Sequence, residues 1–526
     1  MIRPSQSNTL PALVDARAAD TPERELLRFE DEPLSCAQLR ERVRAAGAGL
    51  RRRGIRRGDR IVIYMENCRE FAEAWLGAMY IGAMPVPVNL AYRGEFLRHQ
   101  VVDSGASLIV TDPGQLQAVQ DVVGGCPGIE TIAVAGEGEL PDSSGAALTT
   151  TGMLFRGSLE EDATTARWDE PGTILYTSGT TGLSKGVVLS HSYLVAMARV
   201  ICDAFEFTAD DVYYCMLPMF HVSGLTGVWN ALISGAPSVI DRRFSVSATW
   251  DRVRRYGATG TSMVGPMLQM LWNLPEDSRD AELPLRFIGV APVPDGLDDA
   301  IKRRYGLEAI VSMYGMTEAF PLAIAGVGDR LPASVAGRAN PTFDVRIVDE
   351  LGKDVPSGIP GEIICRPRTA HVMFEGYFRD EERTAAAFRD GWFYTGDYCR
   401  FDAEENISFV DRKKDTIRRR GENISSFELE NAIRKHPRVA DAAVHAVPSD
   451  LGEDDVKVVI VAGSGVRPSS EELWRFFEAE LPRFAVPRYI EFVDEIPKNP
   501  VGRVLKFELR ERGVTAETWD RESRGC

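Results

Sequence analysis

The sequence predicts an α/β protein with a large N-terminal domain and a small α+β C-terminal domain. Over the first three hundred residues, short apolar runs of strand length alternate with helical segments, which is the pattern of parallel sheets covered by helices. From Val335 to Cys365 short alternating strands separated by turns replace this pattern, and a second strand–helix alternation fills residues 427–526. A chain of 526 residues is long enough to bury the cores of two such domains.

The composition excludes several classes of protein. Hydrophobic residues at 44% and charged residues at 26% are typical of globular domains, and the net charge of −16 argues against nucleic acid as a general partner. No apolar run approaches the ~18 residues of a membrane span, and residues 1–5 contain no apolar signal core. The eight cysteines form no CxxC pair, so we expect reduced thiols and a cytoplasmic protein without a membrane span.

The N-terminal region is predicted to begin with helices that a strand at Leu26–Glu30 interrupts. Ser35 is a suitable N-cap for the helix Ala37–Gly54, because a serine hydroxyl can accept a hydrogen bond from the first turn. Residues 135–170 are rich in Gly, Ser, Thr, Glu and Asp without periodicity, so we predict a solvated linker there. Apolar runs and periodicity further predict strands Ile61–Tyr64, Leu108–Val110, Thr131–Val134, Thr173–Tyr176, Val345–Asp349, Glu362–Arg366, Val439–Val447, Val456–Val461 and Tyr489–Val493, and helices Glu70–Gly82, Ser192–Phe205, Phe427–Lys435 and Ser469–Glu478.

The stretch from Ile174 to Val188 is suited to holding phosphate oxygens. An apolar strand leads into a loop of glycines and hydroxyls with one lysine, and a second apolar run follows. Glycines let backbone N–H groups converge on an anion, hydroxyls add donors, and Lys185 adds a point charge. The spacing differs from a Walker A loop, which needs four residues between its first glycine and Gly-Lys-Ser/Thr and a helix after it. A plain surface turn is the alternative.

Residues 176–186, which read Tyr-Thr-Ser-Gly-Thr-Thr-Gly-Leu-Ser-Lys-Gly, resemble the signature of the adenylate-forming superfamily. This superfamily includes acyl-CoA ligases, peptide-synthetase adenylation domains and luciferases. Its other motifs follow in order, so that the resemblance covers nearly the whole chain and is closest to carnitine- and fatty-acyl-CoA ligases. These motifs lie at residues 218–224, 289–292, 314–318, 391–397, 411–415 and 497–506.

The resemblance completes the predicted fold. It implies a large N-terminal domain of two parallel-type α/β layers plus a small β-barrel, and a small mobile α+β C-terminal domain. The expected boundary gives an AMP-binding N-terminal domain over residues 1–411 and a C-terminal lid domain over residues 412–526, with a hinge near Lys414. Rotation of a small domain about such a hinge is a known switching mode.

The resemblance also implies the nucleotide site. Lys185 is the expected catalytic lysine and holds the β- and γ-phosphates with the loop. Thr317 is expected to hydrogen-bond a phosphate or the bound carboxylate, and Glu318 to hold Mg²⁺, which favours hard oxygen ligands. The other residues expected to bind the nucleotide are Thr177, Ser178, Gly179, Thr180, Thr181 and Gly182 in the loop, Tyr314 on the adenine, Asp397 and Arg412 on the ribose, and Lys414 at the hinge.

A substrate pocket is predicted around His221. This histidine follows an apolar strand in a Pro-x-Phe-His-x-x-Gly context, which resembles the motif that lines the path to the acyl site, so we count His221 as catalytic as well. Val290 stands where the superfamily usually has a small residue, which implies a different shape of the wall. The predicted pocket comprises His221, Ser223, Gly224, Val290, Ala291 and Gly315, with Ser262 and Met263 as further candidates, and core packing is the alternative for each.

The last motif carries an exchange of residue types. The superfamily usually has Gly-Lys there, and that lysine bridges the attacking carboxylate and the α-phosphate. In this sequence Arg503 stands at the lysine position, and Lys506 stands three residues later, where arginine is frequent. Arginine is a rigid fork and lysine a flexible point charge, so the two are not equivalent. Three alternatives stay open: Arg503 does the work, Lys506 reaches in, or the adenylation step is altered.

The resemblance implies ATP-dependent activation of a small-molecule carboxylic acid to an acyl-adenylate, followed by transfer to the thiol of coenzyme A. The implied cofactors are ATP, Mg²⁺ and coenzyme A, and a homodimer is the assembly considered. Two alternatives within the superfamily are an enzyme that loads a carrier protein and an ATP-dependent diazotase that activates nitrite. A non-catalytic nucleotide sensor is a third, but the presence of Lys185, Glu318, Asp397 and Arg412 argues against it.

Overall fold

The computed structural model describes most of the chain and divides it into two compact units. Unit 1 comprises Met1–Asp344 and Arg366–Gly391, and unit 2 comprises Val345–Cys365 and Trp392–Cys526. The described residues are 9–141, 145–159, 166–177, 184–291, 297–332, 335–413, 415, 417–419, 422–449, 454–463, 465, 467–481, 485–498 and 504–523.

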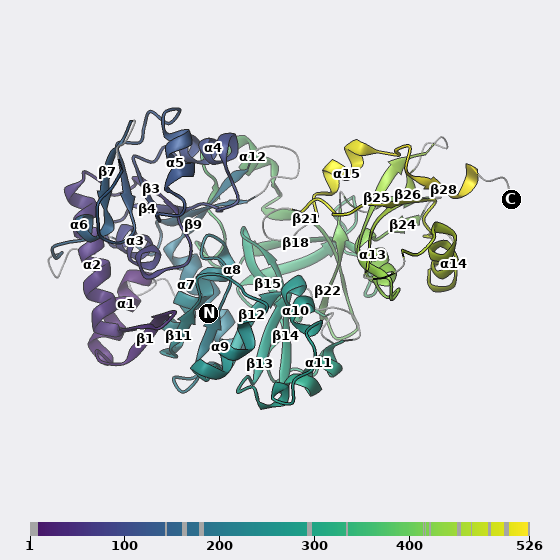
Figure 1. The fold of residues 1–526 in the computed structure, drawn as a ribbon, viewed down its shortest axis with the longest axis horizontal. Helices are drawn as coiled ribbons and strands as arrows, with labels where there is room; N and C mark the ends of the chain where they lie inside the picture. Colours follow the sequence, from purple (N-terminus) through teal and green to yellow (C-terminus); the bar gives the residue numbers. More distant parts are fainter. Residues whose placement is uncertain are drawn as a thin grey trace. The chain divides into compact units, whose positions relative to one another are not determined.

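Unit 1 contains a nine-stranded sheet whose six inner strands are parallel (Figure 1). Antiparallel strands complete it at both edges. In spatial order the strands are β16 (Arg338–Ala339), β15 (Ala319–Ile324), β14 (Ala309–Met316), β13 (Phe287–Ala291), β12 (Gly260–Val264), β10 (Tyr213–Cys215), β11 (Ser238–Ile240), β1 (Glu25–Phe29) and β2 (Glu32–Ser35).

Helices pack on both faces of this sheet because its strands alternate two sets of apolar side chains. On β13, Ile288 and Val290 belong to a core cluster with side chains of α9 (Thr249–Tyr256), α10 (Gly265–Trp272) and α11 (Asp298–Tyr305). Phe287 of the same strand belongs to a second cluster with Ile201 of α7 (His191–Ala204). The remaining helices of unit 1 are α1 (Leu10–Asp20), α2 (Cys36–Arg52), α3 (Arg69–Tyr80), α4 (Gly94–Ser104), α5 (Leu116–Val123), α6 (Thr151–Leu154), α8 (Val222–Ser234) and α12 (Glu381–Ala386).

A second sheet of unit 1 has five strands, all of them parallel. Its apolar side chains form one core cluster with Leu97 and Val101 of α4 and with Val119 of α5. In spatial order its strands are β4 (Met84–Pro87), β3 (Arg60–Tyr64), β5 (Leu108–Thr111), β6 (Thr131–Val134) and β7 (Ala147–Thr150).

A third, antiparallel sheet of unit 1 carries the stretch that the sequence marks for phosphate binding. Its strands are β8 (Pro171–Thr177), β9 (Lys185–Ser190) and β19 (Gly376–Tyr377), with β9 in the middle. The short strand β20 (Phe388–Arg389) also lies in unit 1. The apolar runs on both sides of the loop are therefore neighbouring strands of a hairpin.

Unit 2 combines antiparallel strands with a small α+β layer. The first group is β17 (Phe343–Val348), β18 (Gly361–Pro367), β21 (Trp392–Phe401) and β22 (Ile407–Arg412), and β23 (Ile417–Arg419) pairs with β24 (Glu422–Ile424). A four-stranded sheet follows, of β25 (Val439–Pro448), β26 (Asp454–Ala462), β27 (Tyr489–Phe492) and β28 (Trp519–Asp520). Its apolar side chains form one cluster with α13 (Ser426–Arg434) and α14 (Ser470–Glu480), and another with Leu509 of α15 (Lys506–Arg512).

The architecture confirms the predicted α/β class and most of the predicted elements. Ser35 caps α2 in a capping box, because its hydroxyl accepts from the Gln38 backbone N–H while the Gln38 side chain accepts from the Ser35 N–H. The prediction of a plain linker over residues 135–170 is wrong, because β7 and α6 lie within it. β7 pairs with β6 at the edge of the five-stranded sheet. The composition of residues 135–170 does not reveal this pairing, because β6 lies outside that stretch. No helix in the described ranges is both long and apolar enough to cross a membrane.

Candidate active site

Several predicted site residues follow the carboxyl ends of parallel strands in the nine-stranded sheet. The chain leaves β10 for β11 on one side and then returns to β12 on the other, so the strand order reverses at β10. Ligands of open α/β sheets bind outside the carboxyl ends of strands at such a reversal. His221 lies beyond the end of β10, and Thr317 and Glu318 directly follow β14. The topology therefore places these residues at the edge where a ligand is expected.

Lys185, Glu318 and Tyr377 form the central polar cluster of unit 1. The Lys185 Nζ lies 2.8 Å from the Glu318 Oε1 and donates to the Tyr377 hydroxyl oxygen at 2.6 Å. The Tyr377 hydroxyl donates to the same Glu318 Oε1 at 2.9 Å. Two of the three residues were predicted from the sequence, and the structure brings them into direct contact.

Strand pairing explains why these residues meet. Lys185 opens β9, and β19 pairs with β9 so that Tyr377 lies opposite Val187. The backbone N–H of Phe374, three residues before Tyr377, donates to the Glu318 carbonyl oxygen at 3.0 Å. Tyr377 was not predicted as a site residue, because neither periodicity nor charge distinguishes the Gly-Tyr pair at 376–377 in the sequence. Only the pairing of β19 with β9 shows where it lies.

The cluster has the donor set of a Mg²⁺ and phosphate site. The Glu318 side chain is 7% exposed and that of Lys185 is 22% exposed. Glu318 Oε1 accepts both hydrogen bonds, while its Oε2 has no hydrogen-bond partner in the described part of the chain. Burial and the neighbouring Glu318 raise the pKa of Tyr377, so this phenol stays protonated at neutral pH.

A single carboxylate fits the way in which proteins bind Mg²⁺ with a nucleotide. Mg²⁺ commonly uses one or two carboxylates together with substrate phosphates and water. Among the described residues no group of three or more His, Cys, Asp or Glu side chains could form an all-protein metal site. The free Oε2 of Glu318 therefore suits Mg²⁺ that arrives bound to phosphates.

A buried tyrosine fixes the turn that contains Thr317. The Tyr193 hydroxyl of α7 donates to the Thr317 carbonyl oxygen at 3.3 Å and accepts from the Phe320 N–H at 2.5 Å. The Thr317 side chain is buried, as is that of Tyr314 on β14. At Gly315 a Cβ atom would lie 2.8 Å from the Ala319 carbonyl oxygen, so close backbone approach requires glycine there.

The end of the phosphate loop at Ser184 is held by α4. The Gln100 side-chain NH₂ donates to the Ser184 hydroxyl at 2.9 Å, and the His99 Nε2 lies 3.0 Å from the Ser184 carbonyl oxygen. At the other end, the buried Thr177 hydroxyl has no hydrogen-bond partner among the described residues. The predicted loop residues that lie outside the described residues are Ser178, Gly179, Thr180, Thr181 and Gly182.

His221 caps a helix. Its Nδ1 accepts from the Ser223 backbone N–H at 3.4 Å and lies 3.0 Å from the Ser223 hydroxyl, which makes His221 the N-cap of α8. The side chain is exposed. Gly224, the third pocket candidate of this motif, packs against the backbone of Pro218 and Leu217.

Gly224→Ala is expected to destabilise unit 1 by about 1–3 kcal/mol, the usual cost of overpacking. A Cβ atom at this position would lie 2.0 Å from the Pro218 carbonyl oxygen. Urea unfolding measures the change, and Gly124→Ala is the matched control because a Cβ atom there meets nothing within 4 Å. Unchanged stability with a raised KM for the acid would instead assign Gly224 to the substrate pocket.

The structure places Val290 and Met263 in the apolar core. Both are almost fully buried and belong to the cluster that packs against α9, α10 and α11. Ser262 lies on the other side of β12, where its hydroxyl would be 2.7 Å from a Cβ atom at Gly289. Ala291 is the last residue of β13. Core packing, the alternative considered from the sequence, therefore describes the surroundings of Val290 and Met263.

In unit 2, Asp397 and Arg412 lie opposite each other on β21 and β22. The Arg412 Nε is 3.5 Å from the Asp397 Oδ1, and the Asp397 side chain is 7% exposed. The neighbouring Lys413 Nζ pairs with the Glu362 Oε2 at 2.8 Å. The strand register thus brings the two predicted ribose contacts together. The predicted hinge residue Lys414 and the predicted catalytic Arg503 lie outside the described residues.

Lys506 is held inside unit 2. Its Nζ lies 2.7 Å from the Glu430 Oε1 and 2.5 Å from the Ser426 hydroxyl, and the side chains of Lys506 and Glu430 are 10% and 7% exposed. Ser426 in turn donates its backbone N–H and its hydroxyl to the Asp411 Oδ2, at 2.6 and 2.7 Å. Burial raises the pKa of Asp411. The network ties the first turns of α13 and α15 to the end of β22.

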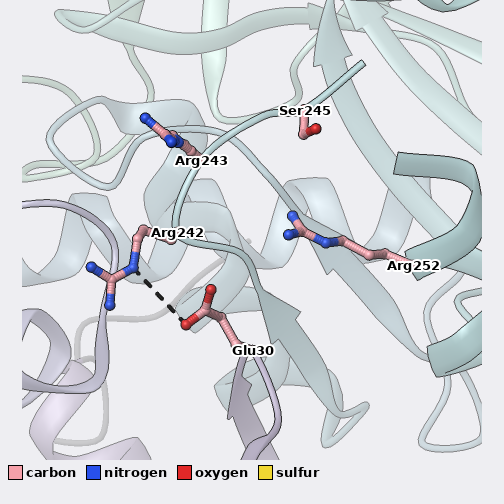
Figure 2. A pocket seen from close by; sticks show the side chains of 5 residues that line it. All are labelled: Glu30, Arg242, Arg243, Ser245 and Arg252. Atoms are coloured by element: carbon pink, nitrogen blue, oxygen red, sulfur yellow. Dashed lines mark ion pairs between the residues drawn. The ribbon is translucent and has the colours of Figure 1, made fainter. Parts of the chain in front are cut away.

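A cavity of about 240 Å³ in unit 1 is lined by Glu30, Arg242, Arg243, Ser245 and Arg252 (Figure 2). None of the residues predicted from the sequence is among those described as lining it. The Arg242 Nε faces the Glu30 Oε2 at 3.9 Å, and Arg252 pairs with the buried Asp241 at 2.6 Å. Since carboxylates already balance two of its three guanidinium groups, we do not assign this cavity to the nucleotide.

Comparison with protein families agrees with the site. Residues 14–378 match the family model described as AMP-binding enzyme, and residues 428–503 match the one described as AMP-binding enzyme C-terminal domain. The chain is 30% identical over 488 residues to a crotonobetaine/carnitine–CoA ligase from Salmonella paratyphi A, with 90% of this chain and 93% of that protein aligned. A ligase of the same name from Salmonella agona is 32% identical over 489 residues, with the same shares aligned.

Solved structures agree with the family and with the predicted fold class. ATP-bound MatB from Rhodopseudomonas palustris superimposes with a TM-score of 0.84 and 28% identity, over 96% of this chain and 98% of that one. O-succinylbenzoate Coenzyme A Synthetase (MenE) from Bacillus subtilis, in complex with AMP, superimposes with a TM-score of 0.82 and 25% identity, over 95% and 98% of the two chains. This chain therefore belongs to the AMP-binding enzyme family of the adenylate-forming superfamily, in its acyl-CoA ligase branch.

Proposed function

We propose that the chain activates a small-molecule carboxylic acid with ATP and transfers the acyl group to the thiol of coenzyme A. The cluster of Lys185, Glu318 and Tyr377 carries this proposal. A cation for phosphate oxygens and a carboxylate with one free oxygen lie side by side there. A carboxylate and a nucleotide are both anions, so a site that joins them must neutralise negative charge.

In the first step a carboxylate oxygen of the acid attacks the α-phosphorus of ATP, and the bond from that phosphorus to the pyrophosphate oxygen breaks. Lys185 is proposed to leave Glu318 and neutralise the charge that develops on pyrophosphate. Mg²⁺, when bound, would supply further charge neutralisation at Glu318. In the second step the sulfur of coenzyme A attacks the acyl carbonyl carbon, the bond to AMP breaks, and the thiol proton is released.

The proposal places the ribose of the nucleotide against Asp397 and Arg412. A carboxylate offers two acceptor oxygens to the two hydroxyls of a ribose, and Asp397 is buried with Arg412 Nε at 3.5 Å. We also propose a C-terminal domain over residues 412–526 that rotates about Lys414. Two separate family models, ending at 378 and beginning at 428, support a boundary between them.

The test measures pyrophosphate release from Mg·ATP with a panel of acids, each with and without coenzyme A. The panel contains fatty, aryl and amino-aryl acids, betaine acids such as carnitine because of the named relatives, and nitrite. We expect release with one class of carboxylic acid, a higher turnover with coenzyme A, and a thioester product by mass spectrometry.

Each other outcome would change the proposal in a specific way. If an acid causes pyrophosphate release that coenzyme A does not raise, and a carrier protein becomes acylated, the chain is a carrier-loading enzyme. Release with nitrite alone would make it a diazotase. Light scattering of the purified protein tests the predicted homodimer independently of the substrate.

A further inference from the structure

Tyr377 lies at the meeting point of the two charged groups, and none of the sequence motifs includes it. Its hydroxyl is 2.6 Å from the Lys185 Nζ and 2.9 Å from the Glu318 Oε1. Its side chain is 7% exposed, and its ring contacts Phe374 at a centroid distance of 5.2 Å. The buried phenol therefore hydrogen-bonds both members of the ion pair, because its hydroxyl accepts from Lys185 and donates to Glu318.

The hydrogen bonds on Glu318 are distributed unequally between its two oxygens. Oε1 accepts from Lys185 and from Tyr377, whereas Oε2 has no partner in the described part of the chain. The terminal torsion of a glutamate is broad, so a carboxylate without anchors turns easily. Two donors on one oxygen restrain the carboxylate plane and leave the other oxygen available to a ligand.

Tyr377 would keep this effect after the nucleotide binds. Phosphate oxygens compete with Glu318 for Lys185, so the ion pair at 2.8 Å is weakened when a nucleotide enters. The hydroxyl of Tyr377 then remains as the anchor on Oε1. The Lys185 Nζ also lies 4.0 Å from the centroid of the Tyr377 ring, so the cation–π contact keeps the cation nearby.

We propose that Tyr377 is a positioning residue that orients Glu318 for Mg²⁺ and keeps Lys185 beside it. This inference rests on the proposed function, since it assumes that Glu318 receives the metal of Mg·ATP. Groups that hydrogen-bond a metal ligand commonly change metal affinity or activity 10–100-fold when they are removed. The structure assigns the orientation of Glu318 to the hydroxyl of Tyr377, and not to its ring.

Tyr377→Phe tests this directly, because the ring and its contacts remain and only the hydroxyl is lost. With a non-hydrolysable ATP analogue bound, we expect the dissociation constant for Mn²⁺, measured by electron paramagnetic resonance, to rise about tenfold. The Mg²⁺ concentration for half-maximal pyrophosphate release should rise by a similar factor, with the KM for the acid unchanged. Tyr305→Phe is the matched control. The buried Tyr305 hydroxyl donates to the Leu271 carbonyl oxygen at 3.0 Å, in the core cluster between α10 and α11.

Wild-type Mn²⁺ affinity in Tyr377→Phe would overturn the proposal. A double-mutant cycle with Glu318→Gln tests the route of the effect. If Tyr377 acts through Glu318, Tyr377→Phe causes no further loss of Mn²⁺ affinity in the Glu318→Gln background, and an additive loss contradicts it. The Mn²⁺ titration needs no turnover. If the wild-type protein releases no pyrophosphate with any acid, the proposed function is wrong, and the titration still measures the effect of Tyr377 on metal affinity.

Discussion

Lys185→Ala is expected to lower pyrophosphate release by about 10²–10³-fold, the usual cost of losing one preorganised charge at a reacting group. The Lys185 Nζ is the cation that contacts Glu318 and Tyr377, at 2.8 and 2.6 Å. Its loss removes that charge from the pyrophosphate that departs. Initial rates at saturating Mg·ATP and acid measure the effect.

The fold of the Lys185→Ala variant should stay intact. Glu318 keeps the Tyr377 hydroxyl as a donor at 2.9 Å, so its buried carboxylate does not lose its last hydrogen bond. Circular dichroism and thermal unfolding check this. Lys302→Ala is the control, because that lysine of α11 pairs with the exposed Asp299 at 3.0 Å and is not a predicted site residue. Normal turnover in Lys185→Ala would remove Lys185 from the phosphate site.

Lys506→Ala is expected to lower the stability of the protein, whereas Arg503→Ala is expected to lower its adenylation activity. Removing the Lys506 cation leaves the Glu430 carboxylate of α13 buried at 7% exposure, and breaking a buried pair costs about 3–5 kcal/mol. The Arg434 Nη2, 3.7 Å from the Glu430 Oε2, offsets part of this, so we expect about 3 kcal/mol of lost stability. Urea unfolding followed by tryptophan fluorescence measures it.

Arg503→Ala is expected to lower adenylation by about 10²–10³-fold. Lys506 cannot serve the α-phosphate without breaking its buried contacts to Glu430 and Ser426, so we infer that Arg503 supplies the cation. ATP–pyrophosphate exchange at a temperature where each variant is folded measures this step alone. Lys498→Ala removes a 39% exposed lysine of the same motif that pairs with Asp441, so it should leave adenylation unchanged and cost about 0–1 kcal/mol of stability. A stable Lys506→Ala variant that has lost exchange would reverse the assignment.

The sequence by itself determined the class of the protein and most of its elements. Apolar runs at Ile61–Tyr64 and Thr131–Val134 predict strands because burial depends on side chains within the run. Ser35 and Gln38 predict a helix start because a cap is a contact over three residues. Lys185 and Glu318 were predicted from motifs that are contiguous in the chain. In each case the physical cause lies within a few residues.

The tertiary structure decided what depends on residues far apart in the chain. Only the pairing of β19 with β9 brings Tyr377 to Lys185, 192 positions away. Only the contact of the Lys506 side chain, at the start of α15, with α13 shows that Lys506 is held by Glu430. Only the pairing with β6 shows that residues 147–150, within a polar stretch, form an edge strand. Local sequence carries propensity and burial pattern, whereas contacts between distant segments depend on how sheets and helices assemble. That difference is why the sequence predicted the chemistry, and the structure showed which distant residues contact the predicted site.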